Sequence, residues 1–190
     1  MSKTAYQNSI FTIGHSTRSI EEFISLLKAH QIETVIDIRS IPKSRHCPQF
    51  NQEALKRSLK NAQIGYRHRK DLGGLRHTTK DSINTGWINS SFRGYADYMQ
   101  TPKFEAALGK LETIAEKKRC ALLCAEAVPW RCHRSLVADA LTARKWKVFH
   151  IQSKKTAKLH KLTPFLKIKK GKLIYPREKL SALEDKPYRN

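Results

Sequence analysis

Short apolar runs of strand length alternate along this chain with segments of helical periodicity. Strands are expected at 10–14, 34–39, 65–68, 120–126 and 147–151. Helices are expected from residue 20, at 51–63, 91–99 and 101–118, and at 132–145. Alternation of this kind is typical of a parallel sheet with helices on both faces. The pattern predicts an α/β fold with a mostly parallel, doubly wound (Rossmann-like) sheet over about 9–152.

Polar residues with capping chemistry precede three of these helices. Ser19 is followed three positions later by Glu22, which is the spacing of a capping box. Asn51 is expected to cap the second helix, and Thr101 with Pro102 is expected to begin the helix that ends near residue 118. These signals set the helix starts independently of the apolar pattern.

Length and charge restrict the class of protein. At 190 residues the chain is long enough for one substantial core, so a single domain over 1–190 is expected. The 37 Lys and Arg residues outnumber the 16 acidic residues, which gives a formal net charge of +21. Such an excess favours DNA, RNA or a nucleotide as the partner, although a merely solvated lysine-rich surface is the alternative.

No apolar stretch reaches the length of a membrane span, and residues 1–7 lack the apolar run of a signal peptide. The four cysteines form no Cys-x-x-Cys pair. A cytoplasmic protein with free thiols is therefore expected, with no membrane, metal or cofactor. Residues 153–190 carry twelve Lys or Arg against three acidic residues and are expected to pack on the core as a basic extension.

Polar side chains recur where the predicted strands end. His15 follows the first strand, Asp37 and Arg39 end the second, and Glu126 ends the fourth. Ligands of open parallel sheets bind outside the carboxyl ends of the strands, so these residues are expected to meet in one pocket. An ion pair between Asp37 and Arg39 that only stabilises the sheet rim is the alternative for those two residues.

Glu126 is the first candidate for a catalytic group. Burial beside the apolar strand would raise its pKa toward neutrality and suit it to acid–base or glycosidic-bond chemistry. A structural carboxylate paired with Arg131 or Arg134 is the alternative. Arg131, His133 and Arg134 surround the predicted first turn of a helix, where unpaired N–H groups favour an anion, so they are expected to bind phosphate together with Arg39.

Two cysteines are candidates for thiol chemistry. Cys124 shares a strand face with Glu126 and is either a nucleophile or a small apolar residue. Cys132 lies at the predicted helix start beside His133 and should therefore ionise more readily, with simple packing as the alternative. The six residues between Cys124 and Arg131 do not fit the Cys-x5-Arg phosphate loop, and Cys124, Cys132 and His133 have no standard metal-site spacing.

Aromatic and loop residues complete the candidate site. Tyr66 and Trp130 are possible platforms on which bases stack, with packing of loops onto the core as the alternative. Residues 71–90 are rich in Gly, Thr, Asn and Ser, which predicts a long surface loop that binds or covers a substrate.

Several motifs together resemble the domain of unknown function 488 family. They are Thr12-Ile13-Gly14-His15-Ser16, Asp37-Ile38-Arg39, Leu72-Gly73-Gly74, Leu123-Cys124-Ala125-Glu126 and Cys132-His133-Arg134. The resemblance covers nearly the whole chain and implies that residues 153–190 belong to the domain. Some members of the family carry a putative DNA-repair label, which the resemblance extends to this chain as an expectation.

Three functions follow as hypotheses. The first is an enzyme acting on a nucleotide or nucleic acid, in which Glu126 is the acid–base group and His15, Asp37 and Arg39 complete the site. The second is a non-catalytic nucleic-acid-binding module with the same basic pocket. The third is thiol or phosphate chemistry at Cys124 or Cys132.

Overall fold

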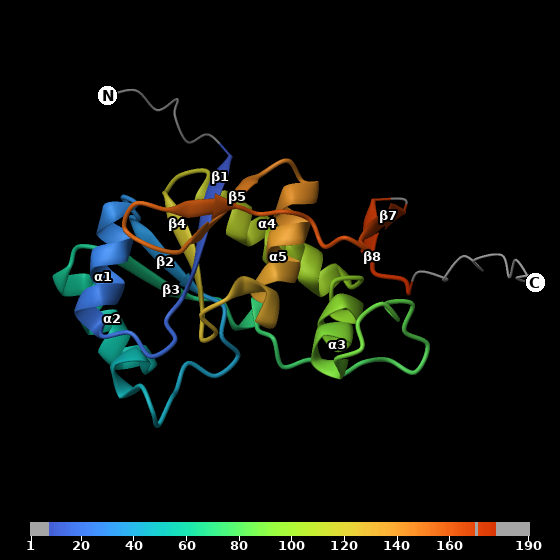
Figure 1. Ribbon diagram of the computed structural model, residues 1–190, viewed down its shortest axis with the longest axis horizontal. Coiled ribbons are helices and arrows are strands. Elements are labelled where there is room, and N and C mark those ends of the chain that lie inside the picture. Colours follow the sequence, from blue (N-terminus) through green and yellow to red (C-terminus); the bar gives the residue numbers. More distant parts are fainter. Residues whose placement is uncertain (1–7, 170, 178–190) are drawn as a thin grey trace, which may run out of the picture.

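A computed structural model describes residues 8–169 and 171–177. Its main feature is a six-stranded sheet with the order β3-β2-β4-β1-β5-β6, drawn in Figure 1. Five strands are parallel, and β6 is antiparallel to β5 at one edge. The strands are β1 (Ser9–Gly14), β2 (Thr34–Asp37), β3 (Gly65–His68), β4 (Cys120–Cys124), β5 (Lys147–Ile151) and β6 (Ala157–Leu159). The predicted mostly parallel α/β sheet is confirmed.

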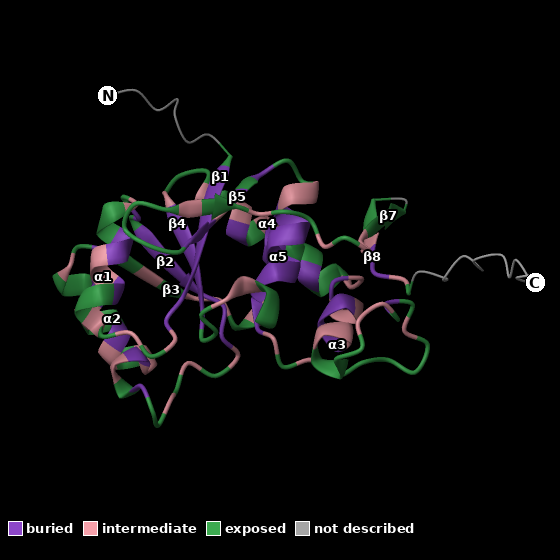
Figure 2. Ribbon diagram, viewed as in Figure 1, coloured by how far each residue is buried: buried purple, intermediate pink, exposed green. Residues whose placement is uncertain are grey.

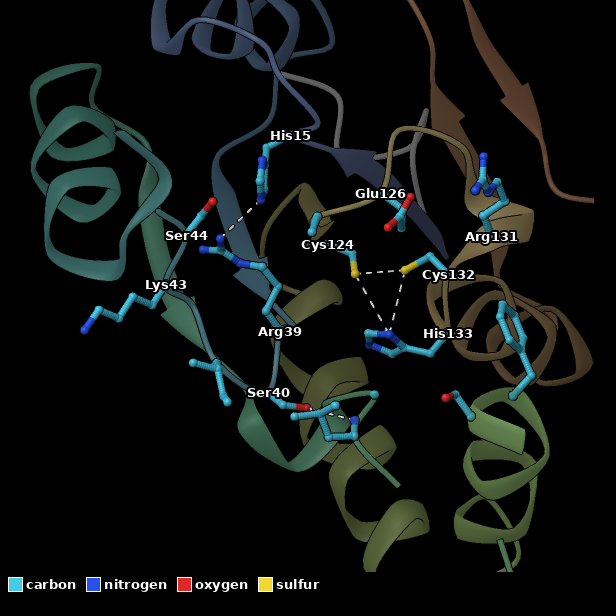
Figure 3. A pocket seen from close by; sticks show the side chains of 16 residues that line it. His15, Arg39, Ser40, Lys43, Ser44, Cys124, Glu126, Arg131, Cys132 and His133 are labelled. Atoms are coloured by element: carbon cyan, nitrogen blue, oxygen red, sulfur yellow. Dashed lines mark hydrogen bonds between the residues drawn. The ribbon is translucent and has the colours of Figure 1, made fainter. Parts of the chain in front are cut away.

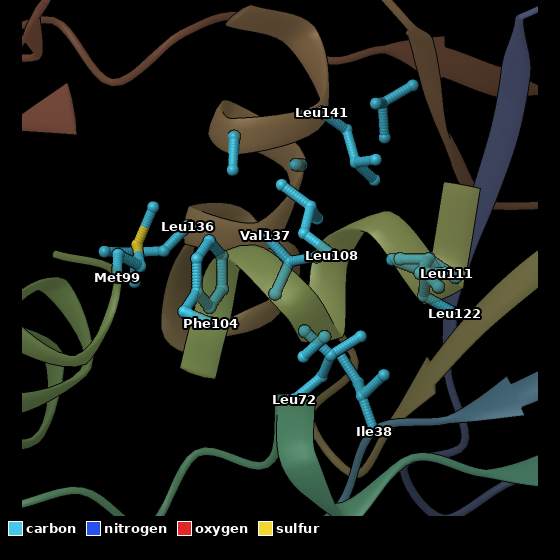
Figure 4. Close-up of a cluster of buried hydrophobic side chains, with 14 of the residues drawn as sticks. Ile38, Leu72, Met99, Phe104, Leu108, Leu111, Leu122, Leu136, Val137 and Leu141 are labelled. Atoms are coloured by element: carbon cyan, nitrogen blue, oxygen red, sulfur yellow. The ribbon is translucent and has the colours of Figure 1, made fainter. Parts of the chain in front are cut away.

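Helices cover both faces of this sheet (Figures 1 and 2). Alternate strand residues such as Phe11, Val35 and Leu123 pack with α1 (Ile20–Ala29) and α2 (Gln52–Asn61). Ile10, Ile36 and Leu122 face the other way and pack with α4 (Pro102–Ala115) and α5 (Arg134–Ala143), as Figure 4 shows for part of that cluster. The helix α3 (Ser90–Tyr98) extends this second layer. Short 3-10 helices occur at η1 (Pro48–Phe50), η2 (Lys70–Leu72) and η3 (Pro129–Arg131).

The strands β1 and β4 lie at the topological switch point of the parallel sheet, where successive connections change the side of the sheet on which they run. These strands are neighbours, with Gly14 opposite Cys124. After β1 the chain enters α1 on one face, whereas after β4 it enters α5 on the opposite face. Because the two connections leave in opposite directions, a crevice opens at the carboxyl ends of β1 and β4, where ligands of doubly wound sheets bind.

Two of the predicted helix caps form as expected. Ser19 Oγ accepts a hydrogen bond from the backbone N–H of Glu22 at 3.1 Å, and Thr101 Oγ1 accepts one from Phe104 at 3.3 Å. Asn51 does occupy the N-cap position of α2, but its side chain makes no capping bond. Its Oδ1 instead accepts a 2.6 Å hydrogen bond from the N–H of Ser44, so it fastens the loop after β2.

Part of the basic C-terminal segment joins the domain. The chain after β5 forms β6 and then a hairpin of β7 (Lys167–Lys169) and β8 (Lys172–Ile174). Asp139 of α5 is fully buried and accepts hydrogen bonds from His160, Thr163 and Tyr175. These bonds hold the described part of the segment against α5. Of the predicted extension 153–190, residues 170 and 178–190 lie outside the described residues, as does the segment 1–7.

A buried histidine in this region makes stability depend on pH. His150 lies between Thr12 Oγ1, at 2.7 Å, and His160 Nδ1, at 2.9 Å. Burial, together with the nearby charges of His160 and Arg134, lowers the pKa of His150 from 6.5 to about 3. The unfolded chain takes up this proton near pH 6.5 and the folded chain does not, so acidification through this window favours unfolding.

We therefore expect the free energy of unfolding to be highest above this window. It should fall by up to about 1.4 kcal/mol per pH unit as the pH decreases toward 3. Urea titrations between neutral pH and about pH 4 measure the slope. His150→Asn should show a shallower slope than the wild type. An equal slope in the two proteins would contradict the assignment.

Among the described residues, no helix is both long and apolar enough to cross a membrane.

Candidate active site at the carboxyl ends of β1 and β4

A pocket of about 440 Å³ occupies the crevice (Figure 3). Five segments supply its walls, namely the end of β1, the loop after β2, the loop before α3, the first turn of α3, and the connection from β4 to α5. The lining residues are His15, Arg39, Ser40, Ile41, Lys43, Ser44, Gly74, Leu75, Ser91, Phe92, Cys124, Ala125, Glu126, Arg131, Cys132 and His133. Of the four residues that were predicted to meet at the strand ends, His15, Arg39 and Glu126 line this pocket.

Close backbone packing joins the two strand ends. The N–H groups of His15 and Ser16 donate to the carbonyls of Cys124 and Ala125, at 3.0 and 2.8 Å. A Cβ at Gly14 would lie 1.8 Å from the carbonyl oxygen of Glu126, so only glycine permits this approach. Ser16 has a φ of 48°, an unfavourable conformation for serine that recurs at functional sites.

His15 is a neutral imidazole in the pocket wall. Its Nδ1 donates to the carbonyl of Ser16 at 2.8 Å, and its Nε2 accepts from Arg39 at 3.3 Å. Its ring stacks on Phe50 with centroids 4.4 Å apart. Burial, reinforced by the Arg39 charge, lowers the pKa of His15, while the bond to Ser16 opposes that shift. His15 is therefore suited to hydrogen bonding or to accepting a proton.

Asp37 and Arg39 form a buried ion pair. Arg39 Nε and Nη2 donate to the two carboxylate oxygens of Asp37, at 2.9 and 2.6 Å, and Nη2 also reaches the carbonyl of Phe50. Tyr66 donates its hydroxyl to Asp37 at 2.8 Å. Burial, followed by the charge of Asp37, raises the pKa of Tyr66 and keeps it a donor. The structural ion pair, which was the alternative for these two residues, describes this geometry.

Three predicted roles change as a result. Asp37 is completely buried and does not line the pocket, so it has no access to a substrate. Arg39 lines the pocket but directs its guanidinium to Asp37, Phe50 and His15, which leaves it poorly placed to clamp phosphate. Tyr66 lies outside the lining and is engaged with Asp37, so its expected stacking on a base has no support here.

Two cysteine sulfurs meet on the floor of the pocket. Cys132 Sγ donates to Cys124 Sγ at 2.8 Å. That hydrogen bond, with His133 and Arg134 nearby, lowers the pKa of Cys124 well below its ordinary value despite burial. The same bond and burial raise the pKa of Cys132. The expectation that Cys132 ionises more readily is therefore wrong, because its proton is shared with the neighbouring sulfur.

His133 faces the two sulfurs instead of the open pocket. Its Nδ1 lies 3.9 Å from Cys124 Sγ and 3.7 Å from Cys132 Sγ, and its Nε2 lies 3.1 Å from the carbonyl of Ile38. The three side-chain atoms lie within 4.8 Å of one another, so they could hold a metal ion. With both ring nitrogens engaged, His133 is not placed to bind phosphate as expected.

Arg134 also differs from its predicted role. It is 1% exposed, lies outside the pocket lining, and donates through Nη2 to the carbonyls of Glu126 and Ala127, each at 3.2 Å. Burial lowers the pKa of its guanidinium. Arg134 thus fastens the turn after β4, and its guanidinium is not placed to bind a phosphate in the pocket.

Charged side chains remain available at the mouth of the pocket. Glu126 and Arg131 are both exposed and line it, and Trp130 between them is 66% exposed. The burial that was expected for Glu126 is therefore absent. Lys43 is also exposed and lines the pocket from the loop after β2. The sequence does not predict it as a site residue, although it follows the carboxyl end of a predicted strand.

The long predicted loop is confirmed and reaches the site. Residues 73–89 form no helix or strand. Gly74 packs against His133, where a Cβ would lie 2.4 Å from Nδ1. Asp97 of α3 accepts hydrogen bonds from Thr78, Thr79, Ser82 and Asn84, which fastens the loop. The loop therefore forms a fixed wall of the pocket.

The fold and site define a doubly wound α/β protein. Its pocket contains thiol, imidazole and carboxylate groups and lies at the topological switch point of the sheet, between β1 and β4. Residues 19–141 match the model of the family described as domain of unknown function DUF488. The chain belongs to that family. No curated protein matches the chain, and no solved structure matches it.

Proposed function

We propose that this protein is an enzyme that acts on a nucleic acid or nucleotide in the pocket between β1 and β4. The observation that carries the proposal is the exposed carboxylate of Glu126 on a pocket whose mouth also carries Lys43 and Arg131. A carboxylate at such a position can move a proton, while the two cations hold the phosphate of the substrate. Glu126 is the acid–base group of the proposal.

A second cavity favours a substrate longer than one nucleotide. This cavity, of about 750 Å³, shares Ser40, Ile41 and Leu75 with the first. Four cationic side chains line it, namely Lys70, Arg76, Lys103 and Lys110. Together with the net charge of +21, they provide a basic path along which a phosphate backbone can continue beyond the pocket. Nucleic acid is therefore preferred to a free nucleotide.

A base of that nucleic acid would be the reacting group. Enzymes that modify a base within a duplex must first take it out of the stack, and the exposed ring of Trp130 could support the extruded base. The putative DNA-repair label fits this form of the proposal. The proposal includes a cytoplasmic location, which the free cysteines support because they are typical of a reducing compartment.

Comparison of Glu126→Gln with the wild type tests the proposed enzyme. Pools of nucleotides, damaged DNA and RNA oligomers are incubated with each protein, and products are identified by mass spectrometry. We expect product with wild type and a rate at least about 100-fold lower with Glu126→Gln, since general acid–base groups contribute at least that much.

Glu21→Gln is the matched control, because Glu21 is an exposed glutamate on α1 outside the pocket. It should turn over like wild type. Binding of oligomers should weaken steeply with salt in all three proteins. Salt-sensitive binding with unchanged pools would contradict an enzyme and favour the binding module.

Thiol chemistry at Cys124 is a second candidate, which the contacts of Cys124 and His133 favour. The carbonyl of Ile38 orients the imidazole of His133, and this imidazole faces the sulfur of Cys124. The three groups have the arrangement of a nucleophile, its base and the group that orients the base. This candidate predicts that alkylation of Cys124 stops product formation while Glu126→Gln retains full activity. The opposite pattern would exclude it.

A further inference from the structure

We infer that Cys124, Cys132 and His133 form a binding site for a zinc-type divalent ion. Two sulfurs and one imidazole nitrogen converge from the end of β4 and the turn before α5, at distances of 2.8, 3.7 and 3.9 Å. Figure 3 shows the three side chains pointing toward one another on the pocket floor. Thiolate and imidazole in a set of three are ligands that Zn²⁺ prefers.

The hydrogen bond of His133 leaves the correct nitrogen for the ion. A backbone carbonyl only accepts, so the 3.1 Å contact with Ile38 places the ring proton on Nε2. Nδ1 therefore presents a lone pair to the two sulfurs. Metal-binding histidines usually donate their other ring N–H to a carbonyl or carboxylate in this way.

The sulfur of Cys132 has a corresponding support. The backbone N–H of Arg134 lies 3.4 Å from Cys132 Sγ. Such a donor stabilises a thiolate, because the hydrogen bond to a charged acceptor is stronger than the bond to a neutral one. The proton that Cys132 shares with Cys124 leaves when the ion binds, because thiols bind a divalent ion as thiolates.

The distances match a tetrahedral ion at two edges out of three. Bonds of about 2.3 Å to sulfur and about 2.0 Å to nitrogen place sulfur and nitrogen about 3.5 Å apart and two sulfurs about 3.8 Å apart. The observed sulfur to nitrogen distances are 3.7 and 3.9 Å. The two sulfurs are 2.8 Å apart. They must separate by about 1 Å when the ion replaces the proton that they share.

The fourth position would open into the pocket, since all three ligands belong to its lining. Three protein ligands with an open position are the arrangement of catalytic zinc, which binds a water and makes it acidic. Glu126 lies two residues beyond Cys124, and no described side-chain contact occupies its carboxylate. In hydrolysis, Glu126 would accept the proton of the water bound to the ion, and this role rests on the proposed function. Binding of the ion itself does not rest on the proposed function.

Metal analysis of the full chain tests the site directly. The protein is loaded with Zn²⁺ or Co²⁺ under a thiol-free reductant, freed of excess ion, and examined by elemental analysis and absorption spectroscopy. We expect one ion per chain, and for Co²⁺ a thiolate charge-transfer band with the visible bands of a tetrahedral site. Cys124→Ser and His133→Gln should each lower affinity by more than about 100-fold, since loss of a ligand exceeds loss of its supporting contact.

Cys120→Ser is the matched control. Cys120 is buried at the opposite end of β4 and contributes no ligand. This variant should keep one ion per chain, and circular dichroism should verify that every variant is folded. A wild-type protein that binds no stoichiometric ion, or whose Co²⁺ spectrum lacks the thiolate band, would overturn the site. So would equal alkylation rates of Cys124 with and without Zn²⁺.

Glu126→Gln separates this proposal from the proposed function. The variant should retain one ion per chain and an unchanged Co²⁺ thiolate band, because Glu126 is not a ligand. Stoichiometric binding without any nucleic-acid product would keep the metal site and reject the function. Product formation by a protein that binds no ion would reject the metal site and keep the function.

Discussion

Asp37→Ala is expected to destabilise the folded protein by about 3–5 kcal/mol, since removal of one partner leaves the other charge buried and uncompensated. Asp37 is fully buried and Arg39 is 6% exposed, so loss of the carboxylate leaves the guanidinium without its counter-charge in a site that is largely shielded from water. The backbone N–H of Arg39 and the hydroxyl of Tyr66 also lose their acceptor. The effect should appear as a lower denaturant midpoint in equilibrium unfolding.

Tyr66→Phe is the control for this ion pair. It removes a single 2.8 Å hydrogen bond to Asp37 and leaves the salt bridge intact. A loss of about 1 kcal/mol is expected. If Asp37→Ala cost no more than Tyr66→Phe, the charge of Arg39 would be compensated elsewhere, and the pair would not have the structural role described above.

Asp139→Ala is expected to cost about 3–5 kcal/mol and to release the C-terminal segment locally. Its carboxylate accepts from His160 Nε2 at 2.8 Å, from the N–H and Oγ1 of Thr163 at 3.0 and 2.7 Å, and from the hydroxyl of Tyr175 at 3.0 Å. Bonds to a charged group contribute about 1.5–3 kcal/mol each and are not additive, which sets this range.

Hydrogen exchange locates the effect of Asp139→Ala. Protection should fall at Thr163 and Tyr175 before it falls in the central strands, because only the segment loses its attachment. Asp81→Ala is the matched control, since Asp81 is exposed in the loop before α3, and its effect should stay within about 0.5 kcal/mol. Uniform loss of protection would show that the segment and the sheet unfold as one unit.

The sheet was predictable because its signals are local. Apolar runs of four to six residues identify β1, β2 and β4, and polar caps such as Ser19 and Thr101 mark helix starts. The strands β6, β7 and β8 have three residues each and carry exposed lysines, so they lack an apolar pattern.

The candidate site was predictable in place but less so in roles. Parallel topology brings His15, Arg39 and Glu126 to one edge whatever their contacts are. The partners of Asp37 are different, because Tyr66 reaches it only through the pairing of β2 with β3. Likewise, the hydrogen bond between the thiols of Cys124 and Cys132 depends on the conformation of the turn that separates them, and no local sequence pattern predicts it.

The contact between Gly74 and His133 couples the long loop to the thiols. Gly74 leaves no room for a Cβ beside Nδ1, and the loop that carries Gly74 is held by Asp97. Any ligand that displaces this loop therefore alters the freedom of the imidazole that faces both sulfurs. By thermodynamic reciprocity, occupation of the sulfur and imidazole cluster must change the affinity of the loop for that ligand by the same factor.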